Sequence, residues 1–199
     1  MRSNVCKIEN GTKDLEAILK ESEKVAVYNE LTHKQALQLR LLCEEIDGML
    51  PNIIDEFDGD FWIELEDGVC KLNLSVEFAE FTAEKKNELV AIAKNKKNAA
   101  AVGIVGKIRS ALENVFLDEK LAQAFSMSAD AFHMSTAYST LGDYSYHWTL
   151  SQYRNSVKSD EKPEAWDELE KSVIASVADD VIVGVKGKRA DIIIVKRFI

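Results

Sequence analysis

The chain has 199 residues, of which 46% are hydrophobic and 30% charged, a balance typical of one globular domain. Its formal net charge of −9 argues against a nucleic-acid partner, because binding to a phosphate backbone needs a basic surface. No stretch approaches the ~18 continuous apolar residues that cross a bilayer, and the amino terminus lacks the apolar run of a signal peptide.

The three cysteines, Cys6, Cys43 and Cys70, are widely spaced and form no CxxC pair. That spacing favours neither a zinc site nor a disulfide framework. We therefore expect buried free thiols in a reducing cytoplasm, and no association with membranes.

The first two predicted elements are a short edge strand over residues 4–9 and an amphipathic helix over residues 13–30. A longer helix is predicted over residues 32–57, where Thr32 and Gln35 have the spacing of a capping box. Its apolar side chains recur at steps of three and four and predict one buried stripe. The stripe consists of Leu39, Leu42, Ile46, Met49, Leu50, Ile53 and Phe57.

The opposite side of this helix carries Leu37, Leu41, Glu44 and Gly48, a mixture that a purely solvated surface does not need. We therefore expect something to lie over it. Pro51 has no N–H for the carbonyl one turn earlier, which predicts a kink or local opening there. Glu44, Asp47 and Asn52 then lie near one irregular turn, a suitable place for a ligand or a partner.

A β-hairpin is predicted over residues 61–78, because apolar and polar residues alternate on both sides of Asp67-Gly68. The Asp-Gly pair suits a type I′ turn, whose two central residues need positive φ. A short helix is expected from Thr82 or Ala83 to Ile92.

The most basic stretch, residues 94–98, is followed by Gly103, Gly106 and Lys107 at the start of another predicted helix. Free N–H groups, close backbone approach at glycine and nearby lysines are what a phosphate group uses. The spacing matches neither GxGxxG nor the P-loop. Tight helix packing with solvated lysines explains the same residues equally well.

Residues 126–143 show no clean period, and residues 144–151 predict a strand with an aromatic face that belongs to the core. A helix is then expected from Pro163 to Val177, followed by a second hairpin over residues 180–198. The continuous aliphatic run from Ile192 to Val195 indicates a strand covered on both faces. Together these elements predict a single α+β domain over residues 1–199, a two-layer sandwich with helices on one face of a mixed or mostly antiparallel sheet.

Signatures of common catalytic sites are absent from the sequence. His33, His133 and His147 belong to no HExxH, GxSxG or Cys-His pattern. The Glu44-Glu45 pair is the acidic feature that could orient water or accept a proton. An exposed pair of helix carboxylates is the commoner explanation of such a pair.

The order of these elements resembles the Bergerat-type ATP-binding fold of the histidine-kinase-like ATPases, gyrase and Hsp90. It is similar most of all to small stand-alone bacterial anti-sigma-factor kinases. The features that carry the likeness are a helix bearing Glu44, a hairpin whose second strand ends in Glu77, a basic loop leading into Gly103 and Gly106, and an aliphatic terminal hairpin. The likeness covers most of residues 32–198, with residues 117–159 looking like an insertion.

The resemblance assigns roles to individual residues. Glu44 matches the family's catalytic glutamate, and Gly48 occupies the position of the asparagine that binds Mg²⁺, so no metal ligand stands there. Asp47 and Asn52 are adjacent and could replace that ligand only after rearrangement. Glu77 stands where the family's aspartate accepts from the adenine amino group, without the glycines that follow it.

Gly103, Gly106 and Lys107 match the family's glycine-rich lid. The resemblance therefore implies an ATP-binding regulatory protein like an anti-sigma-factor serine kinase, with weak or no hydrolysis. Its partner would be a protein, such as a sigma-factor regulator, and a homodimer is a further expectation. Two alternatives remain open. One is a catalytically inactive interaction or switch module on the same fold, and the other is an unrelated α+β enzyme that uses Glu44 or Asp47 as an acid-base group.

Overall fold

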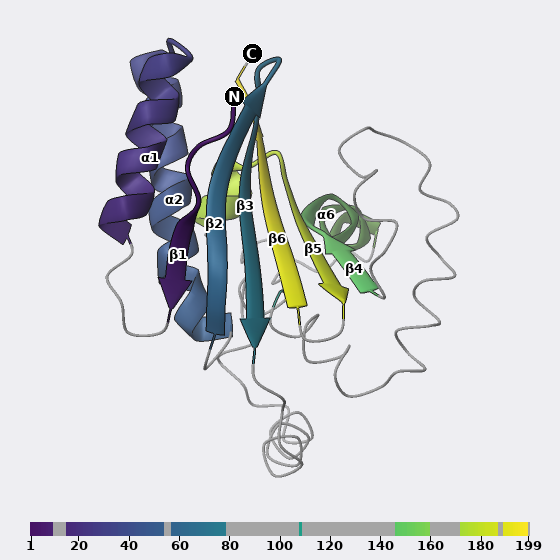
Figure 1. Ribbon diagram of the computed structural model, residues 1–199. Coiled ribbons are helices and arrows are strands. Elements are labelled where there is room, and N and C mark those ends of the chain that lie inside the picture. The colour runs from purple at the N-terminus through teal and green to yellow at the C-terminus, as the bar shows by residue number, and fades with distance from the viewer. Residues whose placement is uncertain are drawn as a thin grey trace.

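In the computed structural model, the described residues are 1–9, 15–53, 57–78, 108, 146–159, 172–186 and 189–198. Six described strands form one sheet in the order β1-β2-β3-β6-β5-β4, and every described pairing is antiparallel (Figure 1). The strands are β1 (Cys6–Glu9), β2 (Phe57–Glu66), β3 (Val69–Phe78), β4 (Tyr146–Thr149), β5 (Asp180–Lys186) and β6 (Arg189–Arg197). The helices are α1 (Leu15–Tyr28), α2 (His33–Ile53), α6 (Leu150–Ser159) and α8 (Val173–Val177).

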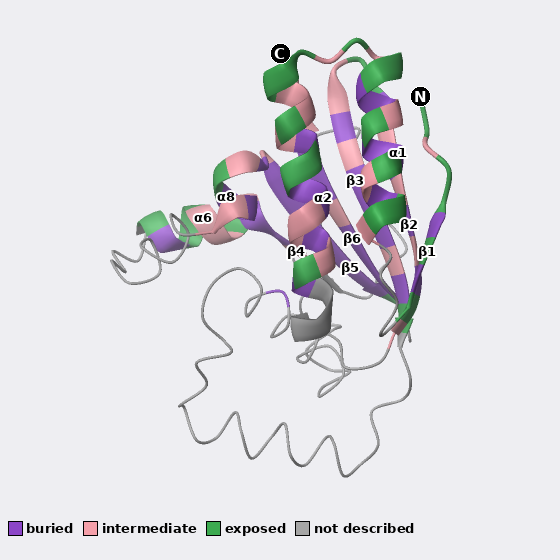
Figure 2. Cartoon of the chain, turned by 90° about the vertical axis from the view of Figure 1, so that its left-hand side faces the viewer, coloured by how far each residue is buried: buried purple, intermediate pink, exposed green. Residues whose placement is uncertain are grey.

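The predicted α+β class is confirmed, and the sheet buries one face under helices. Strand residues opposite one another in register point to the same face. Phe61, Leu74, Ile192 and Val183 form one such row, and each is at most 1% exposed. They share a hydrophobic cluster with Leu39, Leu42 and Ile46 of α2. Figure 2 shows α1 and α2 side by side, with the strands behind them.

The capping box at the start of α2 is confirmed. The Gln35 backbone N–H donates to Thr32 Oγ1, and the Thr32 N–H donates to Gln35 Oε1. Leu39, Leu42, Ile46 and Met49 are buried as the stripe predicts. The prediction that the helix reaches Phe57 is wrong, because Phe57 begins β2 and pairs with Phe78. The helix continues past Pro51 and ends at Ile53.

Both predicted hairpins are confirmed, as is the edge strand. β1 pairs only with β2 among the described strands, and it carries Cys6 and Ile8 into the core. Asp67 and Gly68 have φ of 49° and 75°, the pair of positive values that a type I′ turn requires. In β6, Ile192, Ile194 and Val195 are buried and Ile193 is partly buried, in keeping with a covered central strand.

Two predictions near the carboxyl-terminal half are wrong. Leu150 and Ser151 begin helix α6 instead of continuing the strand, because the Asp180 carboxylate accepts from the Ser151 N–H and Oγ at 3.0 Å each. The helix that reaches Val177 starts at Ser172, whose extended backbone and Oγ cap α8, so it does not run unbroken from Pro163. Of the predicted insertion over residues 117–159, the last part supplies β4 and α6. Its earlier part and the helix predicted up to Ile92 lie outside the described residues.

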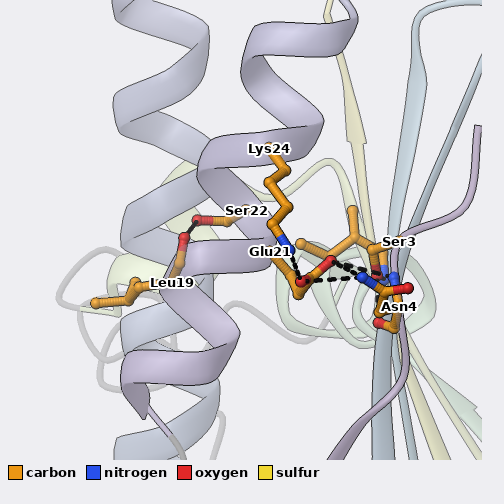
Figure 3. Close-up of polar contacts among 7 residues, drawn as sticks. Ser3, Asn4, Leu19, Glu21, Ser22 and Lys24 are labelled. Atoms are coloured by element: carbon orange, nitrogen blue, oxygen red, sulfur yellow. Dashed lines mark hydrogen bonds and ion pairs between the residues drawn. The ribbon is translucent and has the colours of Figure 1, made fainter.

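Glu21 ties α1 to the segment that leads into β1 (Figure 3). Its carboxylate accepts from the Asn4 backbone N–H at 3.1 Å, from the Asn4 amide at 3.2 Å, and from Lys24. Burial of Glu21 tends to raise its pKa. This effect is outweighed by the hydrogen bonds from Lys24 and Asn4 and by the positive charge of Lys24, so the pKa of Glu21 is lowered. The ionised form therefore stabilises the fold.

We expect Glu21→Gln to lower the free energy of unfolding by about 1–2 kcal/mol near neutral pH, because a buried charge-assisted cluster loses its anion. A lowered folded-state pKa contributes stability above the unfolded value of about 4.3, and that stability is lost as pH falls through the folded pKa. The deficit should therefore shrink towards about pH 3 in denaturant titrations. Glu66→Gln at an exposed strand end is the control. If Glu21→Gln lowers the free energy of unfolding equally near neutral pH and near pH 3, this role of Glu21 is contradicted.

Substitution by alanine should change the free energy of unfolding in opposite directions at Gly59 and at Gly48. A Cβ at Gly59 would lie 2.7 Å from the Ser75 carbonyl oxygen and 2.8 Å from Val76 Cγ1, so the strands must separate. We expect Gly59→Ala to destabilise by roughly 1–3 kcal/mol. A Cβ at Gly48 meets nothing within 4 Å, and alanine favours a helix by about 0.5–1 kcal/mol over glycine. Denaturant unfolding of both variants measures this contrast, and changes of the same sign would contradict it.

Candidate functional site

Glu44 lies on the side of α2 away from the sheet. Its Oε1 pairs with Arg40 Nε at 3.0 Å, one helical turn earlier, and Arg40 Nη1 also contacts Glu23 of α1 at 3.3 Å. The Glu44 side chain is 39% exposed. In this arrangement the Glu44 carboxylate belongs to a surface ion-pair network that links α1 to α2. Glu44 could act as a general base only after Arg40 had moved away.

A groove of about 790 Å³ runs between α1 and α2 beside this ion pair. Its lining combines two leucines with five charged residues. The lining residues are Leu15, Glu16, Leu19, Lys20, Glu23, Arg40 and Asp47. Asp47, three residues after Glu44 on α2, lines this groove, and all of the lining residues come from α1 and α2.

Gly48 follows Glu44 by one turn and is exposed. The open space around it would accommodate a side chain, so packing does not require glycine there. Asn52 stands in the last turn of α2. Gly103, Gly106 and Lys107 lie outside the described residues.

Glu77 lies near the end of β3, and the structure does not bring it to Glu44. Its register neighbours are Asp58 on β2 and Arg189 on β6. Those residues alternate with the buried row that faces α2, so Glu77 points to the outer face of the sheet. One small ligand cannot touch Glu44 and Glu77 in this arrangement.

The outer face carries a polar groove of about 360 Å³ that sequence reasoning did not identify. It is formed where β1, β2, β3 and β6 lie side by side. The lining residues are Arg2, Val5, Lys7, Asp58, Gly59, Asp60, Trp62, Ser75, Glu77 and Arg189. In the sequence, the polar residues that alternate with apolar ones along β2 and β3 were the only signal of this groove. The groove forms only when four strands lie side by side, and the sequence pattern does not show which strands do so.

Charged side chains of both signs line this groove, and two of its bases form ion pairs, Lys7 with a neighbouring strand and Arg189 within its own strand. Lys7 Nζ lies 2.8 Å from Asp60 Oδ1, and Arg189 Nε lies 3.0 Å from Asp191 Oδ1. A hydrogen bond to Asp60 and its negative charge raise the pKa of Lys7. The Arg2 guanidinium stacks 4.7 Å from the Trp62 ring centre, a cation–π contact. The groove is therefore lined by three bases and three acids together with one aromatic ring.

The cysteines confirm the prediction of buried free thiols, since all three are buried and none forms a disulfide. Burial raises the pKa of Cys70 to about 12 and also raises the pKa of Cys43. Thiols held in the neutral form are poor nucleophiles. Within the described ranges, no group of three or more His, Cys, Asp or Glu residues could hold a metal ion, and no helix is long and apolar enough to span a membrane.

Comparisons with family models, curated proteins and solved structures gave no match to this chain. The site is therefore defined by the geometry described above.

We expect the native protein to resist a thiol-reactive disulfide reagent near pH 8, because the thiols are buried and two of them have raised pKa values. All three thiols should react after unfolding in denaturant, which serves as the control for reagent and stoichiometry. Rapid labelling of one thiol in the folded protein, followed by mass spectrometry, would contradict the burial described here.

Proposed function

We propose that this chain is a nucleotide-binding regulatory protein with a Bergerat-type fold and little or no phosphoryl transfer. The observation that carries the proposal is the order of elements. An edge strand precedes α1 and α2, the β2–β3 hairpin follows the helix that bears Glu44, and the β5–β6 hairpin ends the chain against β3. These elements form one antiparallel sheet with helices packed on one face, and this arrangement supports the proposal.

The nucleotide would bind on the helix side of the sheet. Glu44 and Gly48 occupy one turn of α2, and the phosphate groups would approach Gly103, Gly106 and Lys107. Glu77 points to the other face and takes no part in this version of the site. ATP or ADP is the proposed ligand.

Two features of α2 argue for slow turnover. Gly48 offers no oxygen ligand where the family places its metal-binding asparagine, and Mg²⁺ supplies much of the charge stabilisation in phosphoryl transfer. Glu44 is held by Arg40 at 3.0 Å, so it would first have to leave an ion pair to act as a base. The protein would therefore act through its bound state on a protein partner, in the manner of a sigma-factor regulator.

Thermal unfolding with ATP or ADP, each with and without Mg²⁺, tests this proposal. A ligand at about 100 times its Kd adds ~2.7 kcal/mol, which raises the Tm by several degrees. We expect a shift that does not depend on Mg²⁺. No shift with any nucleotide would overturn the proposal.

Gly48→Asn sharpens the test, because the open space at Gly48 can accept the side chain. The added amide oxygen restores the family's metal ligand, so the Tm shift with ATP should become larger when Mg²⁺ is present. Gly48→Ala is the matched control, since it changes helix propensity without adding a ligand. A Mg²⁺ effect that is the same in both variants would contradict the assigned role of position 48.

A catalytically inactive interaction module on the same fold is the second candidate. It is favoured by the exposed Leu37 and Leu41, which are 51% and 40% exposed on the outer side of α2. It is also favoured by the engagement of Glu44 with Arg40. Absence of any nucleotide shift, together with binding that depends on these leucines, would favour this candidate over the first.

A further inference from the structure

The amino-terminal segment contains a β-bulge beside the outer groove. Arg2 forms a bridge with Glu64, and Cys6 is the register partner of Phe61. Three residues of the segment therefore stand opposite two residues of β2, one more than a regular ladder allows. The extra residue reverses the alternation of side chains, so Arg2 and Val5 line the same groove although they are three residues apart. A bulge that redirects side chains in this way is common next to active sites.

Glu21 of α1 holds this bulge in place from the helix side. Its carboxylate accepts from the Asn4 backbone N–H at 3.1 Å and from the Asn4 side-chain amide at 3.2 Å (Figure 3). Glu21 is only 8% exposed. A buried carboxylate thus fixes the position of the segment that forms one wall of the groove.

The acids and bases of the groove are not evenly matched. Asp58 and Glu77 are register partners on β2 and β3, and neither forms an ion pair with any residue that the structure describes. Like charges opposite one another in a sheet are unfavourable, so this end of the groove attracts a positively charged group. Each of the three bases, by contrast, has an acid within 4 Å. These pairs are Arg2 with Glu64 at 3.7 Å, Lys7 with Asp60 at 2.8 Å and Arg189 with Asp191 at 3.0 Å.

The wall formed by the amino-terminal segment is basic, with an apolar part in its middle. The side chains of Arg2 and Lys7 are 55% and 71% exposed. A guanidinium carries five N–H donors and an ammonium three, so each can bind a further oxygen beside its present partner. Val5, between them in the chain, is 48% exposed and shares the lining with the Trp62 ring. An anion with an adjacent apolar side chain fits this wall.

We propose that the outer groove binds a free peptide of two or three residues through both of its charged ends. The α-ammonium group of the peptide contacts Asp58 and Glu77. Its α-carboxylate contacts Lys7 and Arg2. Capture of terminal amines and carboxylates is a known mode of peptide recognition, and charge-assisted hydrogen bonds supply its strength.

The dimensions of the groove agree with a ligand of this length. Along β2, the level of Lys7 is two residues, about 7 Å, from Asp58, and the level of Trp62 is four residues, about 13 Å, from it. An extended peptide of two or three residues spans about 7–10 Å. An apolar side chain on its last residue then reaches Val5 and Trp62. The groove volume of about 360 Å³ is in the range of small-ligand sites.

A ligand with one sign of charge fits this groove less well. A polyanion is repelled by the acids on β2 and β3, and a polycation is repelled by the bases on the facing wall. A peptide with both ends free is attracted by both sets. The site lies on the face of the sheet opposite α2, so the proposal goes beyond nucleotide binding and does not rest on it.

The test is a ¹H–¹⁵N NMR titration of the full chain, without nucleotide, with the dipeptide Ala-Leu and the tripeptide Ala-Ala-Leu. The Trp62 indole N–H is the reporter, because Trp62 lines the groove. We expect at least one of the two peptides to shift this signal saturably. The same peptide with an acetylated amino terminus, or with an amidated carboxyl terminus, should bind about tenfold more weakly, because each change removes one ionic contact.

Two variants connect each end of the peptide to its contacts. Glu77→Gln should weaken binding of the free peptide about fivefold or more and leave binding of the acetylated peptide nearly unchanged, because that peptide has no ammonium group. Lys7→Gln should show the same pattern with the amidated peptide. Glu66→Gln removes one charge from an exposed residue outside the groove lining, and it should leave the affinity within about twofold of the wild type. The amide spectrum of each variant shows whether it is folded.

Absence of a saturable change with both free peptides would overturn the proposal. So would equal binding of the free and the amidated peptide, which would point to the amino terminus of a longer chain. The capped peptides test the wild-type protein itself, so the outcome does not depend on a variant that folds. A failure here is also distinct from a failure of the thermal shift with ATP, since the titration contains no nucleotide and reports on the outer face.

Discussion

The packing of α2 against one face of the sheet is the constraint on which the remaining structure depends. Leu39, Leu42, Ile46 and Met49 are all at most 3% exposed. Burial of each such side chain is worth about 1.5–3 kcal/mol, so four of them gain as much as the net stability of a typical domain before conformational entropy is subtracted. The rotation of α2 about its axis is therefore fixed. As a consequence Glu44, Gly48 and Leu41 face outward, where they meet α1, solvent or another molecule.

The period of two in the strands has an equally strict consequence for the sheet. Side chains that alternate with the buried row must lie on the outer face, so Trp62, Asp60 and Glu77 cannot face α2. In the part of the chain that the structure describes, two separate surfaces could therefore bind another molecule. One is built by α1 and α2, and the other is the polar groove across β1, β2, β3 and β6. A nucleotide on the helix side leaves the outer groove available to a different molecule.

Local chemistry was sufficient to predict much of this fold. The capping box of Thr32 and Gln35, the turn at Asp67-Gly68 and the alternation in the hairpins each act over a few residues. The start of α6 also has a local signal, since Thr149 Oγ1 accepts from the Gln152 N–H at 3.2 Å, but the alternation along the preceding strand obscured it. The contact of Ser151 with Asp180, 29 residues further on, could not be predicted locally. In the candidate site, too, local sequence signals and three-dimensional placement have to be distinguished. The resemblance assigned Glu44 and Glu77 to one pocket from their order in the chain, whereas the face on which each lies depends on strand register and on the rotation of α2. Ser172 is a local cap that was missed because one continuous helix was expected from Pro163 to Val177.

The most direct test of the proposed nucleotide site is a two-dimensional ¹H–¹⁵N NMR titration of the labelled protein with ATP. The Gly48 amide reports on the helix side, and the Trp62 indole N–H, which donates to Glu64, reports on the outer face. Binding as proposed shifts or broadens the Gly48 signal saturably and leaves the Trp62 indole unchanged. Saturable change at the Trp62 indole with a constant Gly48 signal would place the nucleotide in the outer groove and contradict the account.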